Sequence, residues 1–164
     1  GSKMGRVEGR VAIVTGAAQG LGATYARALA AEGAKVVIAD RDSGASVVEE
    51  IRASGGEAID VPTDVREEEA TLELVAKTIE GFGKLDILIN NAAIFTAVER
   101  KGFDEISVDE WDLMHAVNVR GTWLCCRAAV AEMRKQQYGK IINISTSRIF
   151  KSITKVGLPS KPLY

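Results

Sequence analysis

Five short apolar runs alternate with amphipathic stretches, and this alternation allows few folds. The runs lie at residues 11–14, 36–39, 58–61, 85–89 and 141–144. A strand buried on both faces is apolar along its whole length, because neither face meets water. Helical patterns between successive strands predict βα units, which place the strands in parallel. We therefore predict an α/β protein with a doubly wound parallel sheet, as the middle of three αβα layers.

The stretches between the first four runs carry apolar residues at helical spacing, which predicts three amphipathic helices. Gly33 and Gly55-Gly56 follow two of them, where helices commonly end. The residues that we predict to face the core are Leu21, Tyr25 and Leu29; Val47, Val48 and Ile51; and Leu72, Val75, Ile79 and Phe82.

A fourth predicted helix begins at Ser107. The sequence Ser-Val-Asp-Glu at residues 107–110 has the spacing of a capping box, in which serine and glutamate satisfy each other's backbone amides. The apolar pattern continues to about Arg134, so we predict one long helix. Its apolar residues include Trp111, Met114, Val117, Trp123 and Leu124.

Composition excludes several classes of partner. The chain of 164 residues predicts one domain, and its net charge of −1 gives no reason to expect nucleic acid or an anionic membrane surface. No apolar run approaches the ~20 residues of a membrane span, and no signal peptide is recognisable. We expect a soluble, cytoplasmic protein.

The two cysteines, Cys125 and Cys126, are adjacent in the sequence. Zinc sites and disulfide frameworks need cysteine or histidine at other spacings, so we predict neither a metal site nor a disulfide. We interpret this pair as buried free thiols.

The turn after the first strand predicts a phosphate site. Its sequence, Thr-Gly-Ala-Ala-Gln-Gly-Leu-Gly at residues 15–22, joins an apolar strand to a helix. A diphosphate there needs backbone amides at close range and the positive end of a helix dipole, and side chains at the glycines would block it. The alternative is a glycine-rich turn without a ligand. The strand before it and the helix after it favour a dinucleotide on a Rossmann-type fold.

Asp40 supports the same site independently. It ends the second strand, about 20 positions beyond the glycines, where a carboxylate accepts hydrogen bonds from ribose hydroxyls. Because a carboxylate repels a 2′-phosphate, we expect NAD rather than NADP. The neighbouring Arg41 favours NADP instead, since arginine accommodates that phosphate. A simple turn or cap role for Asp40 is the alternative.

These residues together resemble the short-chain dehydrogenase/reductase family over about residues 5 to 150. Its glycine pattern, Thr-Gly-x-x-x-Gly-x-Gly, is the one present here. Four further segments follow in the family's order. They are Asp64-Val65, Asn90-Asn91-Ala92-Ala93, Asn118-Val119-Arg120-Gly121 and Gly139-Lys140-Ile141-Ile142-Asn143-Ile144-Ser145.

The resemblance implies a role for each segment. In the family, residues matching Asp64-Val65 contact adenine, and the asparagine matching Asn118 interrupts the helix and holds a water beside the active site. Plain alternatives are that Asp64 caps the third helix, that Asn90 and Asn91 satisfy loop backbone groups, and that Asn118 lies on a solvated face. The implied cofactor-binding residues are Gly16, Gln19, Gly20, Leu21, Gly22, Asp40, Arg41, Asp64, Val65, Asn91, Ala92 and Ala93.

The catalytic end departs from the family. Its members use Ser, Tyr and Lys, and strict alignment places Thr146 at the serine position, while a shift of one residue would present Ser147. Together with Asn118, these are the predicted catalytic residues. The family's Tyr-x-x-x-Lys is absent, and Tyr164 is the final residue. We therefore expect the sheet to be truncated after the fifth strand, and the 164-residue polypeptide to lack dehydrogenase activity.

The leading hypothesis is an NAD-dependent oxidoreductase that interconverts a secondary alcohol and a ketone, and that forms a dimer or tetramer when full-length. The alternative is a fragment or binding module that holds NAD without turnover. A flavodoxin-like or receiver domain is disfavoured by the glycine turn and the Asn118 segment. A Walker-type site is excluded, because no Gly-Lys-Ser/Thr follows the turn.

We predict three segments along the chain. Residues 1–4 are interpreted as a tail left by expression cloning, residues 5–150 as the NAD(P)-binding domain, and residues 151–164 as irregular. The only plausible substrate-lining residues are Ile94 and Phe95, which either indicate an apolar substrate or pack in the core.

Overall fold

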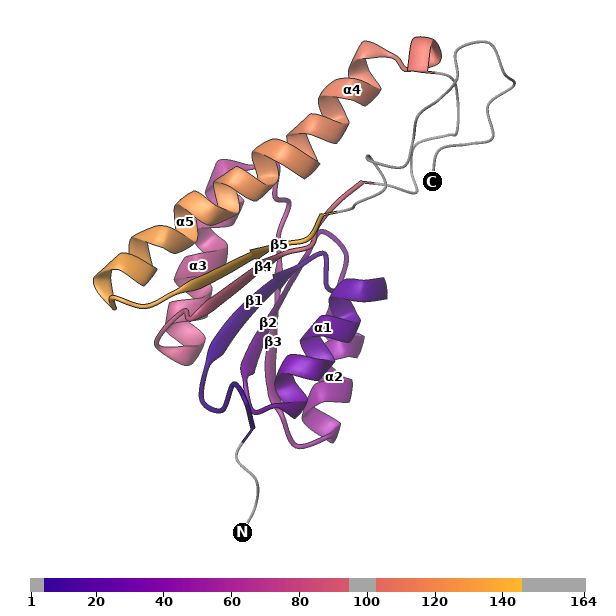
Figure 1. The fold of residues 1–164 in the computed structure, drawn as a ribbon. Coiled ribbons are helices and arrows are strands. Elements are labelled where there is room, and N and C mark those ends of the chain that lie inside the picture. The colour runs from indigo at the N-terminus through magenta and orange to yellow at the C-terminus, as the bar shows by residue number, and fades with distance from the viewer. Residues whose placement is uncertain (1–4, 95–102, 146–164) are drawn as a thin grey trace.

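Five parallel strands form one sheet in the order β3-β2-β1-β4-β5 in the computed structural model, which describes residues 5–94 and 103–145 (Figure 1). A strand overlaps every predicted apolar run. Leu85 precedes the fourth strand and Ile144 follows the fifth. The strands are β1 (Val11–Thr15), β2 (Lys35–Asp40), β3 (Glu57–Pro62), β4 (Ile87–Asn90) and β5 (Lys140–Asn143).

Helices cover both faces of the sheet, which confirms the three-layer prediction (Figure 1). One layer holds α1 (Gly20–Ala31) and α2 (Ala45–Ala53). The other holds α3 (Glu68–Phe82) and α5 (Thr122–Lys135). Within β1 and β2, alternate residues enter the two cores: Val14 and Ile38 pack on the α1/α2 side, and Ile13 and Val37 on the α3/α5 side.

Two of the predicted helix faces were wrong at one residue each. Leu21 is 65% exposed and Leu72 is 51% exposed. The sheet side of α1 is formed by small residues, Gly22, Ala23 and Ala26, so the helix lies close to the strands. In α3 two threonines, Thr71 and Thr78, are buried in place of leucine, and their hydroxyls donate to carbonyls one turn back. A search for apolar residues misses both kinds of inward face.

The predicted single helix from Ser107 was wrong, because it is divided in three, but the break includes Asn118, where the family resemblance implied an interruption. The capping box of Ser107 and Glu110 opens α4 (Val108–His115), as predicted. A π-helical turn, η2 (Ala116–Gly121), follows and leads into α5. A short 3₁₀ turn, η1 (Phe103–Glu105), precedes α4. π turns are rare and concentrate at functional sites.

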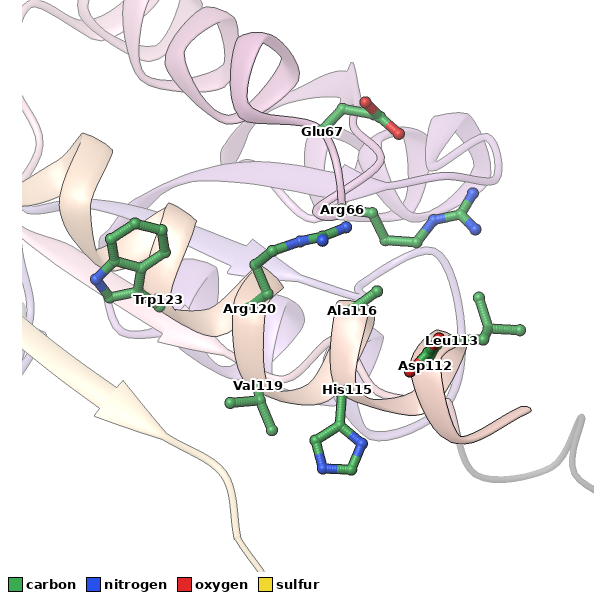
Figure 2. Close-up of a pocket in the computed structure, with 9 residues that line it drawn as sticks. All are labelled: Arg66, Glu67, Asp112, Leu113, His115, Ala116, Val119, Arg120 and Trp123. Atoms are coloured by element: carbon green, nitrogen blue, oxygen red, sulfur yellow. The ribbon is translucent and has the colours of Figure 1, made fainter. Parts of the chain in front are cut away.

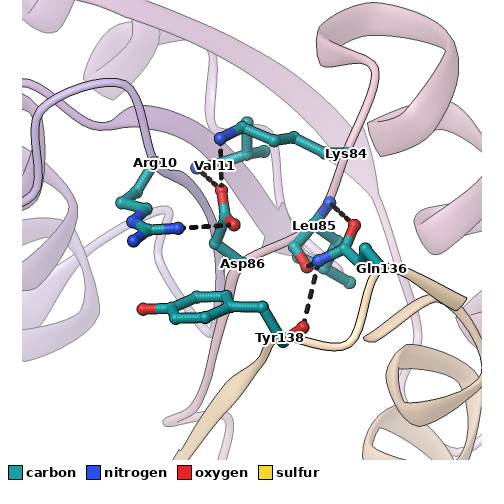
Figure 3. Close-up of polar contacts among 7 residues, drawn as sticks. All are labelled: Arg10, Val11, Lys84, Leu85, Asp86, Gln136 and Tyr138. Carbon is teal, nitrogen blue, oxygen red and sulfur yellow. Dashed lines mark hydrogen bonds and ion pairs between the residues drawn. The ribbon is translucent and has the colours of Figure 1, made fainter. Parts of the chain in front are cut away.

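The amino end of the sheet is fixed by the buried carboxylate of Asp86 (Figure 3). It accepts a hydrogen bond from the amide of Val11 at 2.9 Å and pairs with Arg10 at 3.3 Å and Lys84 at 3.1 Å. The Arg10 guanidinium also lies 4.1 Å from the ring centre of Tyr138. These contacts connect β1, β4 and the turn before β5 at the end opposite the glycine turn.

β5 lies at the edge of the sheet, as predicted. All four of its residues are exposed, although it pairs with β4 along its length. An uncovered apolar edge strand is an aggregation liability. Within residues 5–94 and 103–145, no helix combines the length and apolar character needed to cross a bilayer.

Candidate functional site

The strand order creates a crevice at the carboxyl ends of β1 and β4. The chain leaves β1 towards β2 on one side, and β4 lies on the other side of β1. Such a switch point is where open α/β sheets bind ligands. The predicted residues that follow β1 and β4 therefore meet at one place in the fold.

Two glycines of the turn are required by packing. A Cβ on Gly16 would lie 2.8 Å from the Cα of Ala92, and one on Gly22 would lie 2.2 Å from the carbonyl oxygen of Gly16. The backbone at Gly20 has φ +60°, and a Cβ there would meet nothing within 4 Å. Gly20 therefore leaves open space beside the turn, while Gly16 and Gly22 close the turn against β4.

The start of α1 is suited to an anion. Gln19 precedes the helix in an extended conformation, its side chain makes no capping bond, and the first turn holds no acidic residue. The first amides of an α-helix have no partner within the helix and lie at the positive end of its dipole. Exposed Leu21 lies in this same first turn.

Thr15 and Asn91 fasten the β4 turn to the glycine turn. The Thr15 hydroxyl accepts from the amides of Asn91 and Ala92, both at 3.0 Å. The Asn91 side chain donates to the carbonyls of Thr15 at 3.2 Å and Gly16 at 3.1 Å. The side chain of Asn91 thus acts on the loop backbone, which was the plain alternative for it. Ala93 beyond it is exposed.

Asp40 bridges the glycine turn and the loop after β2. One carboxylate oxygen accepts from the amide of Ala18 at 3.0 Å, and the other accepts from the amide of Asp42 at 2.9 Å. A carboxylate has about four acceptor positions, so these bonds leave two for a ligand. Arg41 next to it is exposed.

Asp64 does not cap α3, whose N-cap residue is Glu67. Its carboxylate is instead gripped by Arg66, with Oδ2 at 2.6 Å from Nη2 and Oδ1 at 3.0 Å from Nε. This hydrogen bonding by Arg66 lowers the pKa of Asp64 below its ordinary 3.8. The following residue, Val65, is buried.

Asn118 lies in the π turn and contacts the loop after β4. Its Oδ1 accepts from the amide of Ile94 at 2.8 Å, and its Nδ2 donates to the carbonyl of Ile94 at 3.3 Å. Asn118 is exposed, yet its oxygen and its nitrogen each form a hydrogen bond with the same backbone residue. Ile94 is half-buried, and Phe95 lies outside the described residues.

Asn90 and Asn143 connect the carboxyl ends of β4 and β5. Buried Asn90 donates from Nδ2 to Asn143 Oδ1 at 2.9 Å and to the sulfur of Cys126 at 3.2 Å. Sequence reasoning missed Asn143, since an asparagine in an apolar run gives no sign of its partner. Cys125 is buried, but Cys126 is half-buried, contrary to the prediction, and burial raises the pKa of Cys125 to about 12.

The predicted catalytic residues Thr146 and Ser147, and Tyr164, lie outside the described residues. The exposed Ser145 ends the described segment just beyond β5. Because all five strands are parallel, Ser145 lies at the carboxyl ends of the strands, as the glycine turn does.

A groove of about 780 Å³ lies between Arg66-Glu67 and the helical segment formed by α4, η2 and α5 (Figure 2). It contains none of the glycine-turn residues, and sequence reasoning did not single it out. His115 lines it, with its ring stacked on Trp111 at 4.3 Å between centres and its Nδ1 2.9 Å from the Trp111 carbonyl. Its other lining residues are Asp112, Leu113, Ala116, Val119, Arg120 and Trp123.

Comparison with known proteins agrees with this geometry. Residues 10–158 match the family model described as short chain dehydrogenase. An uncharacterized oxidoreductase of Thermotoga maritima is 41% identical over 89% of this chain and 57% of its own length. The 2,5-dichloro-2,5-cyclohexadiene-1,4-diol dehydrogenase LinX of Sphingobium indicum is 43% identical over 86% of this chain and 56% of its own length.

A solved metagenomic short-chain oxidoreductase, in complex with NADP, superposes with a TM-score of 0.78 at 36% identity. That match covers 85% of this chain and 63% of the solved one. The chain spans little more than half the length of the two curated relatives. With a family match that covers most of its residues, this chain belongs to the short chain dehydrogenase family of oxidoreductases.

Proposed function

We propose that this protein binds NAD at the switch-point crevice and belongs to an enzyme that interconverts a secondary alcohol and a ketone. The observation that carries the proposal is Asp40, at the end of β2. Its carboxylate lies against the glycine turn with two acceptor positions to spare, which suits the two hydroxyls of an adenosine ribose.

The described residues fit a dinucleotide. Open space at Gly20 and the uncapped start of α1 would receive the diphosphate. Asp64 and Val65 would contact the adenine, and Ala92 and Ala93 would lie beside the rest of the cofactor. When bound, the nicotinamide of such a cofactor supplies or accepts a hydride.

The chain's own contribution to the reaction would be positioning and hydrogen bonding. Asn118 fixes the backbone of Ile94, in the loop that follows β4. A hydroxyl from Thr146 or Ser147 would hydrogen-bond the substrate oxygen. Proton transfer in the family requires a tyrosine whose pKa is lowered by a lysine four positions later, and that pair is absent from these 164 residues. The cofactor site is therefore tested by NADH binding, which does not depend on that pair.

NAD is favoured over NADP because a 2′-phosphate would approach the Asp40 carboxylate. The NADP bound to the metagenomic relative is a property of that protein, and Arg41 is the residue through which NADP would be accommodated here. Affinity for NADH above that for NADPH is the expected result. Equal affinities would count against the role of Asp40.

Titration of NADH fluorescence tests the site. Asp40→Ala should weaken binding by about tenfold or more, since it removes a charge-assisted acceptor worth roughly 1.5–3 kcal/mol. Asp42→Ala is the matched control, because it removes the same charge two residues away while the amide that Asp40 uses remains. No NADH binding by the unmutated chain, or equal losses in both variants, would refute the proposal.

We also propose that a full-length form is a homo-oligomer. Several large apolar side chains on α4, η2 and α5 are exposed, among them Trp111, Leu113, Val119 and Trp123. Leu113, Val119 and Trp123 line one groove, and exposed apolar residues that lie together mark interaction sites. Light scattering on a full-length form should give a mass of two or four chains, and a monomer would contradict the proposal.

A further inference from the structure

Gly121 closes the π turn η2 directly behind the loop between β3 and α3. Both Gly121 and Val65 of that loop are buried. A Cβ on Gly121 would lie 2.7 Å from Cγ2 of Val65, 3.1 Å from its Cβ and 3.2 Å from its carbonyl oxygen. Contacts that short require one of the two segments to move.

Neither the side chain nor the carbonyl oxygen of Val65 can move without an energetic cost. Valine is branched at Cβ, so its side chain has little rotational freedom. The carbonyl oxygen of Val65 belongs to the backbone, and it moves only if the loop moves. A methyl group on Gly121 would therefore displace the loop rather than a flexible side-chain end.

Hydrogen bonds at both ends of the loop between β3 and α3 restrain it against such a displacement. At its start, the Thr63 amide donates to the carbonyl of Asp40 at 2.8 Å. At its end, the Glu67 amide donates to the carbonyl of Asp64 at 3.1 Å, and Arg66 grips the Asp64 carboxylate. A displacement of Val65 would therefore also displace Asp64, the residue before it.

We infer that Gly121 is a positioning residue for the adenine end of the cofactor: its lack of a side chain lets Val65 lie against η2, which holds Asp64 and Val65 where adenine binds. The inference rests on the proposed function, and it deepens that function by assigning a residue that does not itself touch the cofactor. The same π turn carries Asn118, so one irregular turn supports both the adenine loop and the loop after β4.

The test compares Gly121→Ala with Gly81→Ala. Gly81 also lies in a helix, but a Cβ there would meet only the end of the Ile59 side chain, at 3.1 Å. Dissociation constants for NADH and for AMP, which carries the adenine and its ribose, are measured at a temperature where circular dichroism shows each variant folded. Gly121→Ala should weaken both ligands about tenfold, the size of effect expected from overpacking, and Gly81→Ala should leave both unchanged.

A double variant distinguishes positioning from a general loss of packing. Val65→Ala removes the contact at 2.7 Å and leaves those at 3.1 and 3.2 Å, so rescue should be partial. Gly121→Ala with Val65→Ala should bind AMP within about threefold of Val65→Ala alone, roughly 0.7 kcal/mol. If Gly121→Ala does not fold, restored folding and AMP binding in the double variant supports the inference. A folded Gly121→Ala with unchanged affinities, or a double variant without rescue, overturns it. Failure of the unmutated chain to bind either ligand would instead refute the proposed function.

Discussion

The side-chain amide of Asn118 pairs with the backbone of Ile94 through two hydrogen bonds, at 2.8 and 3.3 Å. The pairing joins the π turn to the loop after β4, across two segments that are distant in sequence. Asn118 lies within the π turn that interrupts the helix between Ser107 and Lys135. A regular α-helix would direct this side chain differently, so the contact with Ile94 depends on the π turn.

Asn118→Ala should release the Ile94 amide. Removal of the acceptor oxygen leaves this amide without its partner, and one net hydrogen bond is worth about 1 kcal/mol. We expect hydrogen exchange at Ile94, followed by nuclear magnetic resonance, to accelerate roughly five- to tenfold. Asn118→Asp keeps an acceptor oxygen and should retain most of the protection. Equal exchange in all three proteins would contradict the role assigned to Asn118.

Thr15→Val should destabilise the fold while preserving side-chain shape. The substitution leaves the amides of Asn91 and Ala92 without the hydroxyl that both of them use. We expect the free energy of unfolding to fall by about 1–3 kcal/mol, as measured by urea denaturation. Thr15→Ser retains the hydroxyl and serves as control. A Thr15→Val protein as stable as Thr15→Ser would show that these bonds contribute nothing.

Asp86→Ala should be among the more damaging single substitutions at the amino end of the sheet. It leaves the buried amide of Val11 without its hydrogen-bond acceptor and removes the ion pairs of Arg10 and Lys84 with Asp86. A loss of about 3 kcal/mol is expected from thermal or urea unfolding. Asp86→Asn keeps an acceptor for Val11 and should lose less. NADH affinity of the folded Asp86→Asn protein should not change, since the site lies at the other end of the sheet.

The ion pair of Asp64 and Arg66 should contribute stability only above acidic pH. Because the folded-state pKa of Asp64 is lowered, the contribution is fully present above the ordinary value of 3.8 and disappears as pH falls through the lowered value. Partial exposure limits it to under about 1 kcal/mol. The difference in unfolding free energy between the unmutated chain and Arg66→Ala should be constant from pH 7 to 5 and shrink below pH 3.8. A difference that persists at the lowest pH would rule out this ion pair as its source.

Cys125 should resist alkylation in the folded protein. Burial raises the pKa of its thiol to about 12, so the reactive thiolate is scarce at pH 8. Mass spectrometry after iodoacetamide treatment should find Cys125 unmodified under native conditions and modified in guanidinium chloride. If Cys125 in the folded protein were labelled as fast as an exposed thiol, α5 would pack on the sheet more loosely than described.

Local signals in the sequence were sufficient for the strands, the order of the elements and the Ser107 capping box. Their physical basis is short-range: apolar runs, helical periodicity and turn residues act within a few positions. Helix faces were less predictable. Leu21 and Leu72 fit the period but are exposed, because small residues form the packed face of α1 and two threonines share that of α3 with Leu74 and Val75.

A glycine turn, an acidic residue and two asparagine segments in a Rossmann-type order could be recognised from the residues alone. How they meet became visible in the folded chain. Asp40 bonds to Ala18, Asn91 bonds to the glycine turn, Asn118 bonds to Ile94 and Gly121 packs against Val65. Each of these contacts joins elements far apart in the chain. Their geometry depends on the order of strands in the sheet, which no local pattern of residues encodes. It also depends on the π turn at residues 116–121, whose break at Asn118 was implied by the family resemblance but whose contacts were not.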